Sequence, residues 1–252
     1  MNASAGALPD IIWHDCVGST NEEAHARLAG QNVEPAWVAA AEQTHGRGRL
    51  GRNWVSRPGN LYASLVWPAN VELKRLASLS LVAGLAVRDA VVETGIAVPV
   101  QLKWPNDVLV SGQKVSGVLI ESVALTGCNA AIVGCGLNLA HHPPDTRWPA
   151  TSLAACGITI EPRDMLAKLR STMHSRLTQW SNGSGLAGIQ VDWMSVAMGR
   201  GRRISVEGGR QGIFSGLSED GALVLTLKDG SVFQHLAGDV EWMEQNASIS
   251  ID

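Results

Sequence analysis

The stretch QTHGRGRLGRNW, residues 43–54, decides between two fold classes for this chain. Its Gly46, Gly48 and Gly51 match the G-x-G-x-x-G pattern of dinucleotide-binding folds, in which the glycines lead directly into a helix that receives the pyrophosphate. Here Pro-Gly-Asn at residues 58–60 follows within ten positions, so no helix can begin, and three arginines would crowd a turn that works by being bare. The sequence therefore argues against a dinucleotide-binding fold.

The same loop is typical of a site that binds anions. Its glycines leave backbone N–H groups accessible, and Arg47, Arg49 and Arg52 supply guanidinium groups that match phosphate or carboxylate oxygens. Because little in the local sequence would stabilise it, we expect the loop to be mobile when empty and to order over an anion, shielding a reactive intermediate from water. The plainer alternative is a solvated basic loop.

The segments around this loop predict an α/β body. A short helix is expected to begin at Ser19 and Thr20, each of which forms a capping box with the glutamate three positions later, and Gly30 can end it. Hydrophobic patterns predict strands at residues 37–41, 61–67, 100–104, 108–110, 114–123 and 130–139, and helices at 73–94, 165–180 and 186–197. Hairpin-length turns separate the last four strands, so we expect an antiparallel meander there.

The chain changes character at Gly199, after which only short strands are expected. These lie at residues 204–206, 212–217, 222–227 and 231–236, with Asp-Gly turns between them. Such spacing is typical of a small β-barrel or curled sheet. We therefore predict two domains, residues 1–198 and residues 199–252.

Composition narrows the functional classes. The chain has 252 residues, 45% of them hydrophobic, and a formal net charge of -3, so we expect a folded protein without the basic excess that supports DNA binding. No apolar run is long enough to span a membrane, and the first ten residues do not resemble a secretory signal. The four cysteines lack C-x-x-C spacing. A reduced, cytoplasmic protein is expected.

Two further segments carry candidate site residues. KWPND at residues 103–107 places an amide and a carboxylate, Asn106 and Asp107, at a strand end, and Lys114 follows beyond the next turn. GCGLN at residues 134–138 ends another strand with two glycines and Asn138. A turn, a solvated lysine and a strand cap would explain each piece alone. Their joint occurrence favours one shared site.

Together these segments resemble the signatures of the biotin protein ligase, or biotin-[acetyl-CoA-carboxylase] ligase, family. The matching segments are Ser-Thr-Asn at residues 19–21, the loop at 43–54, residues 103–107 with 114–117, and residues 134–138. The resemblance implies a mixed sheet backed by helices, a catalytic domain like that of class II aminoacyl-tRNA synthetases, followed by a small SH3-like β-barrel. Because the first signature begins at Ser19, we expect a monofunctional ligase without an N-terminal DNA-binding domain.

The resemblance also assigns roles to individual residues. It implies a biotin-binding set of Ser19, Thr20, Asn21, Gln43, Gly46, Arg47, Gly48, Arg49, Lys114 and Gly117. It implies an ATP-binding set of Arg49, Arg52, Trp54, Asn106, Asp107, Lys114 and Asn138. Arg49, Lys114 and Asp107 are the expected catalytic residues. Mg²⁺ would arrive with ATP and lie near Asp107 and Asn138, without a dedicated metal site. Cys135, beside the nucleotide, would make the enzyme sensitive to thiol reagents.

The implied reaction needs no enzyme nucleophile. The carboxylate of biotin attacks the α-phosphate of ATP to give biotinyl-5'-AMP and pyrophosphate, and a lysine of a biotin carboxyl carrier protein then attacks the mixed anhydride. The protein contributes positioning and cationic stabilisation. Two alternatives stay open: a lipoate or octanoate ligase or transferase, and a non-catalytic biotin sensor. An exposed strand edge is compatible with a homodimer or with acceptor docking.

Overall fold

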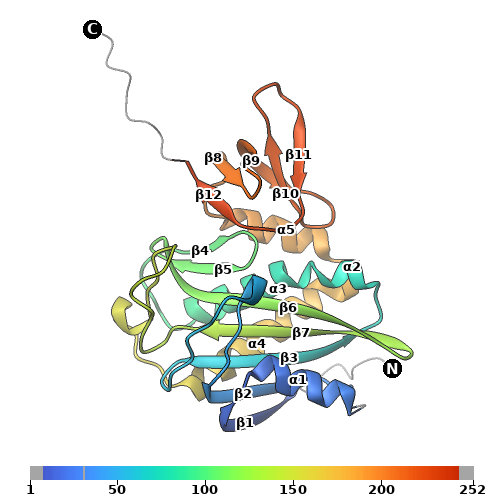
Figure 1. Ribbon diagram of the computed structural model, residues 1–252, viewed down its shortest axis with the longest axis vertical. Helices are drawn as coiled ribbons and strands as arrows, with labels where there is room; N and C mark the ends of the chain where they lie inside the picture. Colours follow the sequence, from blue (N-terminus) through green and yellow to red (C-terminus); the bar gives the residue numbers. More distant parts are fainter. Residues whose placement is uncertain (1–7, 31, 244–252) are drawn as a thin grey trace.

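The first sheet of the molecule is mixed and has seven strands. The structure, a computed structural model, describes residues 8–30 and 32–243, and within them the strand order is β1-β2-β3-β7-β6-β5-β4 (Figure 1). The strands are β1 (Asp10–Val17), β2 (Ala36–Gln43), β3 (Leu61–Ala69), β4 (Val100–Lys103), β5 (Asp107–Val110), β6 (Gln113–Leu125) and β7 (Cys128–Leu137). β1 and β2 are parallel, and all other neighbours are antiparallel. The predicted mixed sheet and its meander are confirmed.

Helices cover both faces of this sheet. They are α1 (Thr20–Ala29), α2 (Leu73–Leu76), α3 (Leu79–Val92), α4 (Pro162–Trp180) and α5 (Leu186–Ser195), with single 3-10 turns η1 (Arg49–Gly51), η2 (Ala154–Cys156) and η3 (Ser181–Gly183). Side chains alternate along each strand, so Val66 and Ile132 pack against Ala24 of α1, whereas their neighbours Leu65 and Val133 face α3 and α4. α1 therefore packs on one face of the sheet, and α3 and α4 pack on the other.

Three local predictions differ from the structure. The predicted helix at residues 73–94 is interrupted at Ser78, whose hydroxyl donates to the Arg75 carbonyl at 2.7 Å and accepts from the Trp180 indole at 3.0 Å. The capping boxes at the start of α1 do not form: Ser19 makes no side-chain cap, and the Thr20 N–H donates instead to Gln43 Oε1 at 2.8 Å. β1 was not predicted, because it is a half-exposed edge strand without a continuous apolar run.

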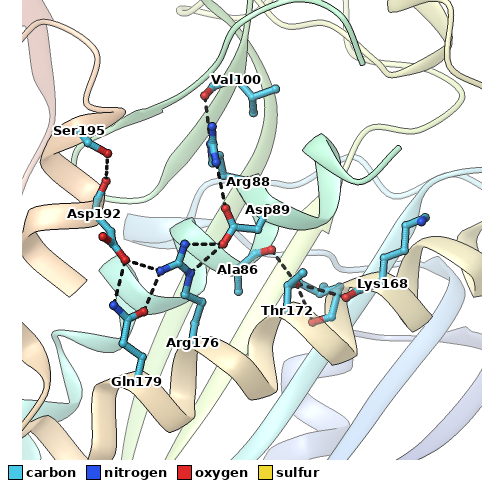
Figure 2. Close-up of polar contacts among 11 residues, drawn as sticks. Ala86, Arg88, Asp89, Val100, Lys168, Thr172, Arg176, Gln179, Asp192 and Ser195 are labelled. Atoms are coloured by element: carbon cyan, nitrogen blue, oxygen red, sulfur yellow. Dashed lines mark hydrogen bonds and ion pairs between the residues drawn. The ribbon is translucent and has the colours of Figure 1, made fainter. Parts of the chain in front are cut away.

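Arg176 links the three long helices behind the sheet. Its guanidinium lies 2.7 Å from Asp89 of α3 and 2.6 Å from Asp192 of α5, and Gln179 donates to the same Asp192 oxygen at 2.9 Å (Figure 2). Arg88 extends the network by donating to the Val100 carbonyl at 3.4 Å (Figure 2). These charge-assisted bonds fix the helix layer on which the sheet rests.

The C-terminal residues form a second, five-stranded antiparallel sheet above β4, β5 and α5 (Figure 1). Its strands are β8 (Arg203–Val206), β9 (Gln211–Leu217), β10 (Leu223–Thr226), β11 (Val232–His235) and β12 (Val240–Trp242), in the order β11-β10-β9-β8-β12. β12 was not predicted. Phe214 and Leu225 belong to the same hydrophobic cluster as the helix layer, and Trp104 donates to the Gly221 carbonyl at 3.3 Å. The predicted fold class, including a small SH3-like C-terminal β region, is confirmed.

Residues 244–252 of the predicted second domain, and residues 1–7 of the first, lie outside the described residues. The division between residues 198 and 199 stays a prediction. Within the ranges 8–30 and 32–243, no helix combines the length and apolar character needed to cross a membrane.

Candidate active site

A cavity of about 620 Å³ opens on the α1 face of the first sheet, beside the second sheet. Its floor is made where Gly117 of β6 and Tyr62 of β3 both pair with Gly136 of β7, and where Ser64 pairs with Gly134. Paired residues of antiparallel strands share a face, so the three glycines point toward the cavity. Its volume is in the range of small-molecule sites.

Glycine is required at these floor positions by the side chains that lie over them. A Cβ at Gly136 would lie 2.6 Å from two atoms of the Trp54 indole, and one at Gly117 would lie 3.1 Å from the same ring. A Cβ at Gly134 would collide with the Asn21 amide. The glycines therefore seat Trp54 and Asn21 against the sheet.

The structure brings almost all of the predicted site residues to this one cavity. Those that line it are Ser19, Thr20, Asn21, Gln43, Arg47, Gly48, Arg49, Arg52, Trp54, Asn106, Asp107, Lys114, Gly117 and Asn138. Gly46 is the exception. A Cβ there would collide with the Ser56 hydroxyl and the Trp54 carbonyl, so Gly46 packs against Ser56 and Trp54 and does not line the cavity.

The side of the cavity next to α1 contains a chain of uncharged polar groups. Gln43 Oε1 accepts from the Thr20 N–H at 2.8 Å and from the Thr20 hydroxyl at 3.1 Å, while Gln43 Nε2 donates to Ser56 Oγ at 2.8 Å. Ser64 Oγ lies 2.7 Å from Thr20 Oγ1 and 2.6 Å from Asn21 Oδ1. This chain of hydrogen bonds fixes the start of α1 against β2 and β3.

The loop at residues 43–54 is a folded hairpin, so the expectation that nothing local stabilises it is wrong. The Gly48 N–H donates to the Arg52 carbonyl at 2.7 Å, and the Trp54 N–H donates to the Gly46 carbonyl at 2.9 Å. Leu50, with φ of 57°, forms the tip together with Gly51. The hairpin places its three arginines on the lining of the cavity, and its ordering over an anion stays a prediction.

Two of the three arginines of this hairpin contact the segment that leads into β12, whereas Arg47 lies 3.5 Å from Glu22 of α1. Arg49 donates to Asn106 Oδ1 at 3.1 Å and to the Gly238 carbonyl at 3.3 Å, and Arg52 forms an ion pair with Asp239. Burial lowers the pKa of Arg49, while the carboxylates of Asp239 and Asp107 oppose that shift. Although burial acts the other way, Arg52 and Arg49 hold the pKa of Asp239 below its usual range. Asp239 therefore stays ionised at neutral pH, where its carboxylate faces both arginines.

Two lysines lie deeper in the cavity. Lys114 Nζ is 2.6 Å from Asp107 Oδ1, with the two side chains 25% and 12% exposed, and it lies 5.3 Å from the centre of the Trp54 ring. Lys103 is buried with its Nζ 4.6 Å from the centre of the Trp148 ring, and burial lowers its pKa. The ion pair of Lys114 with Asp107 places an ammonium group on the cavity wall, where it can also bind an anionic ligand.

Asn138 has a structural bond as well as a place in the cavity wall. It is buried and its Nδ2 donates one hydrogen bond to the Thr151 carbonyl at 3.0 Å, which leaves its second N–H and its amide oxygen for a ligand. Cys135 lies between Gly134 and Gly136, so its side chain points to the other face of the sheet and joins the hydrophobic cluster of Val133, where burial raises the pKa of its thiol to about 12. Because the thiolate is the reactive form, this burial argues against the expected sensitivity of Cys135 to thiol reagents.

Sequence reasoning missed one side of the cavity. The missed lining residues outside the predicted sets include Lys103, Asp145, Thr146, Arg147, Trp148, Asp239, Val240, Glu241 and Trp242. Trp148 and Trp242 meet edge to face with ring centres 6.1 Å apart. In the sequence, Trp148 and Trp242 stand out as tryptophans in polar segments, but nothing in the local sequence indicates that the two side chains contact each other. In the part of the chain that the structure describes, no group of three or more His, Cys, Asp or Glu side chains could hold a metal ion.

Comparison with known proteins places this cavity in context. The model of the Biotin/lipoate A/B protein ligase family matches residues 13–138. A Biotin–[acetyl-CoA-carboxylase] ligase of Paracoccus denitrificans is 38% identical over 218 residues, which cover 82% of this chain and 90% of that protein.

Two solved structures are similar over nearly the whole chain. The biotin protein ligase from Aquifex aeolicus in complex with biotin and ATP has a TM-score of 0.77 and 32% identity, covering 93% of this chain and 99% of that chain. The biotin protein ligase from Leishmania major in complex with biotinyl-5-AMP has a TM-score of 0.67 and 27% identity, covering 92% of this chain and 100% of that chain.

Proposed function

The chain belongs to the biotin/lipoate A/B protein ligase family, and from this premise we propose that its cavity activates biotin with ATP and transfers the biotinyl group to a lysine of a biotin-dependent carboxylase. The activity is that of a biotin–[acetyl-CoA-carboxylase] ligase, and biotin and ATP are its substrates. The acceptor is a biotin carrier protein of such a carboxylase.

One observation supports this function above all others. A single cavity holds an uncharged polar end, built from Thr20 and Gln43, and a cationic end, built from Arg49 and Lys114. A urea-like head group needs neutral donors and acceptors, whereas a carboxylate and a triphosphate need cations. A biotin sensor would need a cation for the carboxylate of biotin but none for a triphosphate.

In the first step the residues at the cationic end stabilise charge. As the biotin carboxylate attacks the α-phosphate, negative charge accumulates on the phosphate oxygens and on the departing pyrophosphate. Arg49, whose guanidinium is already oriented by Asn106, and Lys114, oriented by Asp107, supply fixed positive charge at no cost in reorganisation. We assign these two cations to adenylate formation.

In the second step the acceptor lysine must lose protons. Its amine attacks the acyl carbon of the mixed anhydride, the bond from that carbon to the phosphate oxygen breaks, and AMP leaves. Asp107 is the carboxylate placed beside Lys114 in the cavity, and we assign it to orient the incoming ammonium and receive its proton.

Mg²⁺ fits as a companion of ATP. It commonly takes one or two protein oxygens and completes its shell with phosphate and water oxygens. Asp107 can offer a carboxylate oxygen and Asn138 its amide oxygen. The metal, bound with ATP, would neutralise phosphate charge, while the residues of the chain orient the two reactants.

Four broader assignments complete the proposal. The catalytic domain comprises residues 1–198 and the SH3-like domain residues 199–252. The protein is cytoplasmic, which its four free cysteines support. It does not bind DNA, which its net charge of -3 supports. A homodimer through a strand edge is retained as a proposal.

The test is exchange of labelled pyrophosphate into ATP with Mg²⁺ and biotin, lipoate or octanoate. Exchange with biotin alone supports the proposal, exchange with lipoate or octanoate moves the chain to the other branch of the family, and binding of biotin without exchange leaves a sensor. Lys114→Ala should lower the biotin-dependent exchange rate by about 100-fold. The matched control is Lys74→Ala, at a side chain that is 77% exposed, which should not change the rate.

A further inference from the structure

Glu121 of β6 contacts α1 at two successive turns of the helix. Its Oε2 atom lies 2.5 Å from Asn21 Nδ2 and 3.6 Å from His25 Nε2. Asn21 and His25 are four residues apart, so both side chains point to the same side of α1. Glu121 pairs across the sheet with Ile132, whose side chain packs under the same helix. One carboxylate therefore joins the start of α1 to the sheet.

The Asn21 amide has a fixed orientation because of this contact. A carboxylate can only accept, so Asn21 must turn Nδ2 toward Glu121 and Oδ1 toward the Ser64 hydroxyl, 2.6 Å away. Asn21 is 5% exposed and lies over Gly134, where an added Cβ would collide with its amide. Without the carboxylate, a buried N–H donor would lose its partner.

The orientation is transmitted to the cavity wall. Ser64 Oγ lies 2.7 Å from Thr20 Oγ1, and Thr20 in turn contacts Gln43 through its N–H and its hydroxyl. Thr20 and Gln43 line the cavity at its uncharged end, whereas Glu121 is not among the lining residues. Any effect of Glu121 on a ligand must therefore pass through Asn21 and the first turn of α1.

We propose that Glu121 is a positioning residue for biotin, which it serves by holding Asn21 and the start of α1 against the sheet. This inference rests on the proposed function, because it assigns the uncharged end of the cavity to biotin. It predicts a separation of the two substrates. Loss of the contact disturbs the Thr20 and Gln43 wall and leaves Arg49 and Lys114 in place, since neither touches this hydrogen-bond chain.

The test measures KM for biotin and for ATP in the pyrophosphate-exchange assay. Glu121→Ala should raise KM for biotin by about tenfold, with KM for ATP and kcat within about twofold of the parent protein. Glu121→Gln, which keeps an oxygen acceptor, should raise KM for biotin by only about threefold. His25→Ala removes the longer contact alone and should leave both KM values unchanged.

A double-mutant cycle identifies the route of the effect. If Glu121 acts through Asn21, then Glu121→Ala should add nothing to KM for biotin in an Asn21→Ala background. Should Glu121→Ala fail to fold, the same cycle is measured with Glu121→Gln. An unchanged KM for biotin, equal rises in both KM values, or full additivity in the cycle would overturn the proposal. If the parent protein exchanges pyrophosphate with lipoate instead, the proposed function fails, and the cycle is then read on KM for lipoate.

Discussion

Replacing Gly136 by alanine should disturb the Trp54 wall of the cavity. The added Cβ would lie 2.6 Å from two indole atoms and 2.8 Å from a third, whereas carbon atoms attract one another best at about 3.5–4.0 Å. The ring must therefore retreat by about 1 Å. Its backbone cannot follow, because the Trp54 N–H is bonded to the Gly46 carbonyl at 2.9 Å and the Trp54 carbonyl accepts from Ser56 at 2.8 Å.

The expected cost follows from two opposing terms. Overpacking of this kind costs about 1–3 kcal/mol, and replacing a strand glycine by alanine returns about 0.5–1 kcal/mol of conformational free energy. The free energy of unfolding should fall by about 1–2 kcal/mol, which lowers Tm by about 2–8 °C for a chain of this size. Because Trp54 lines the cavity, KM for biotin should rise at the same time.

Thermal unfolding and pyrophosphate exchange measure the two effects together. Gly216→Ala is the matched control, since Gly216 also lies in an antiparallel strand and a Cβ there meets no atom within 4 Å. The control should keep or raise Tm by about 1–4 °C and leave KM unchanged. A Gly136→Ala protein with the Tm and KM of the parent would refute the claim that this glycine exists to seat Trp54.

Three further predictions concern stability and reactivity. Arg176→Met should lower the free energy of unfolding by about 2–3 kcal/mol in urea titrations, because Asp89 and Asp192 lose the cation between them and only Arg88 stays beside Asp89, while KM for biotin stays the same. Cys135 should resist a coloured disulfide reagent in the native protein and react once urea unfolds it, whereas exposed Cys16 reacts at once; early loss of activity through Cys135 would contradict this. Burial lowers the pKa of His235 in the native state. Below about pH 6.5 His235 therefore binds a proton more readily in the unfolded chain than in the native protein, and Tm should fall as pH drops from 7 to 5.5. His235→Gln should flatten that slope, and equal slopes would disprove the assignment.

The sequence predicted those parts of the fold that are specified locally. The meander from β4 to β7 was found because short turns separate alternating segments, so that pairing follows from chain order. β1 was not predicted, because it pairs in parallel with β2 after an intervening helix and its side chains are half-exposed. The start of α1 was predicted at the correct position but from the wrong contacts. The Thr20 N–H, which was expected to bind a side chain of the capping box, donates instead to Gln43, 23 residues further along the chain.

The site divides along the same line between local and distant contacts. Residues within the recognised segments were found, whereas the contacts of Arg49 and Arg52 with Gly238 and Asp239 were not. These contacts join residues almost two hundred positions apart, and neither Gly238 nor Asp239 stands in a pattern that marks a site. Trp148 was likewise not among the predicted site residues, because a single tryptophan carries no information about the Lys103 ammonium that lies over it.

Glycines from three separate segments, Gly46, Gly117 and Gly136, all pack against Trp54, which the family resemblance alone did not indicate. Gly46 lies against the Trp54 carbonyl, and Gly117 and Gly136 lie against its indole. An indole needs a flat floor, and two adjacent strands can offer one only if the facing residues lack a Cβ. These glycines are therefore fixed by packing around Trp54, whereas Gly48, in the arginine hairpin, meets only Arg52. It follows that substitutions at Gly117 and Gly136 should act through the position of Trp54. In the parent protein Gly136→Ala should lower Tm, whereas in a Trp54→Ala protein the same substitution should leave Tm unchanged.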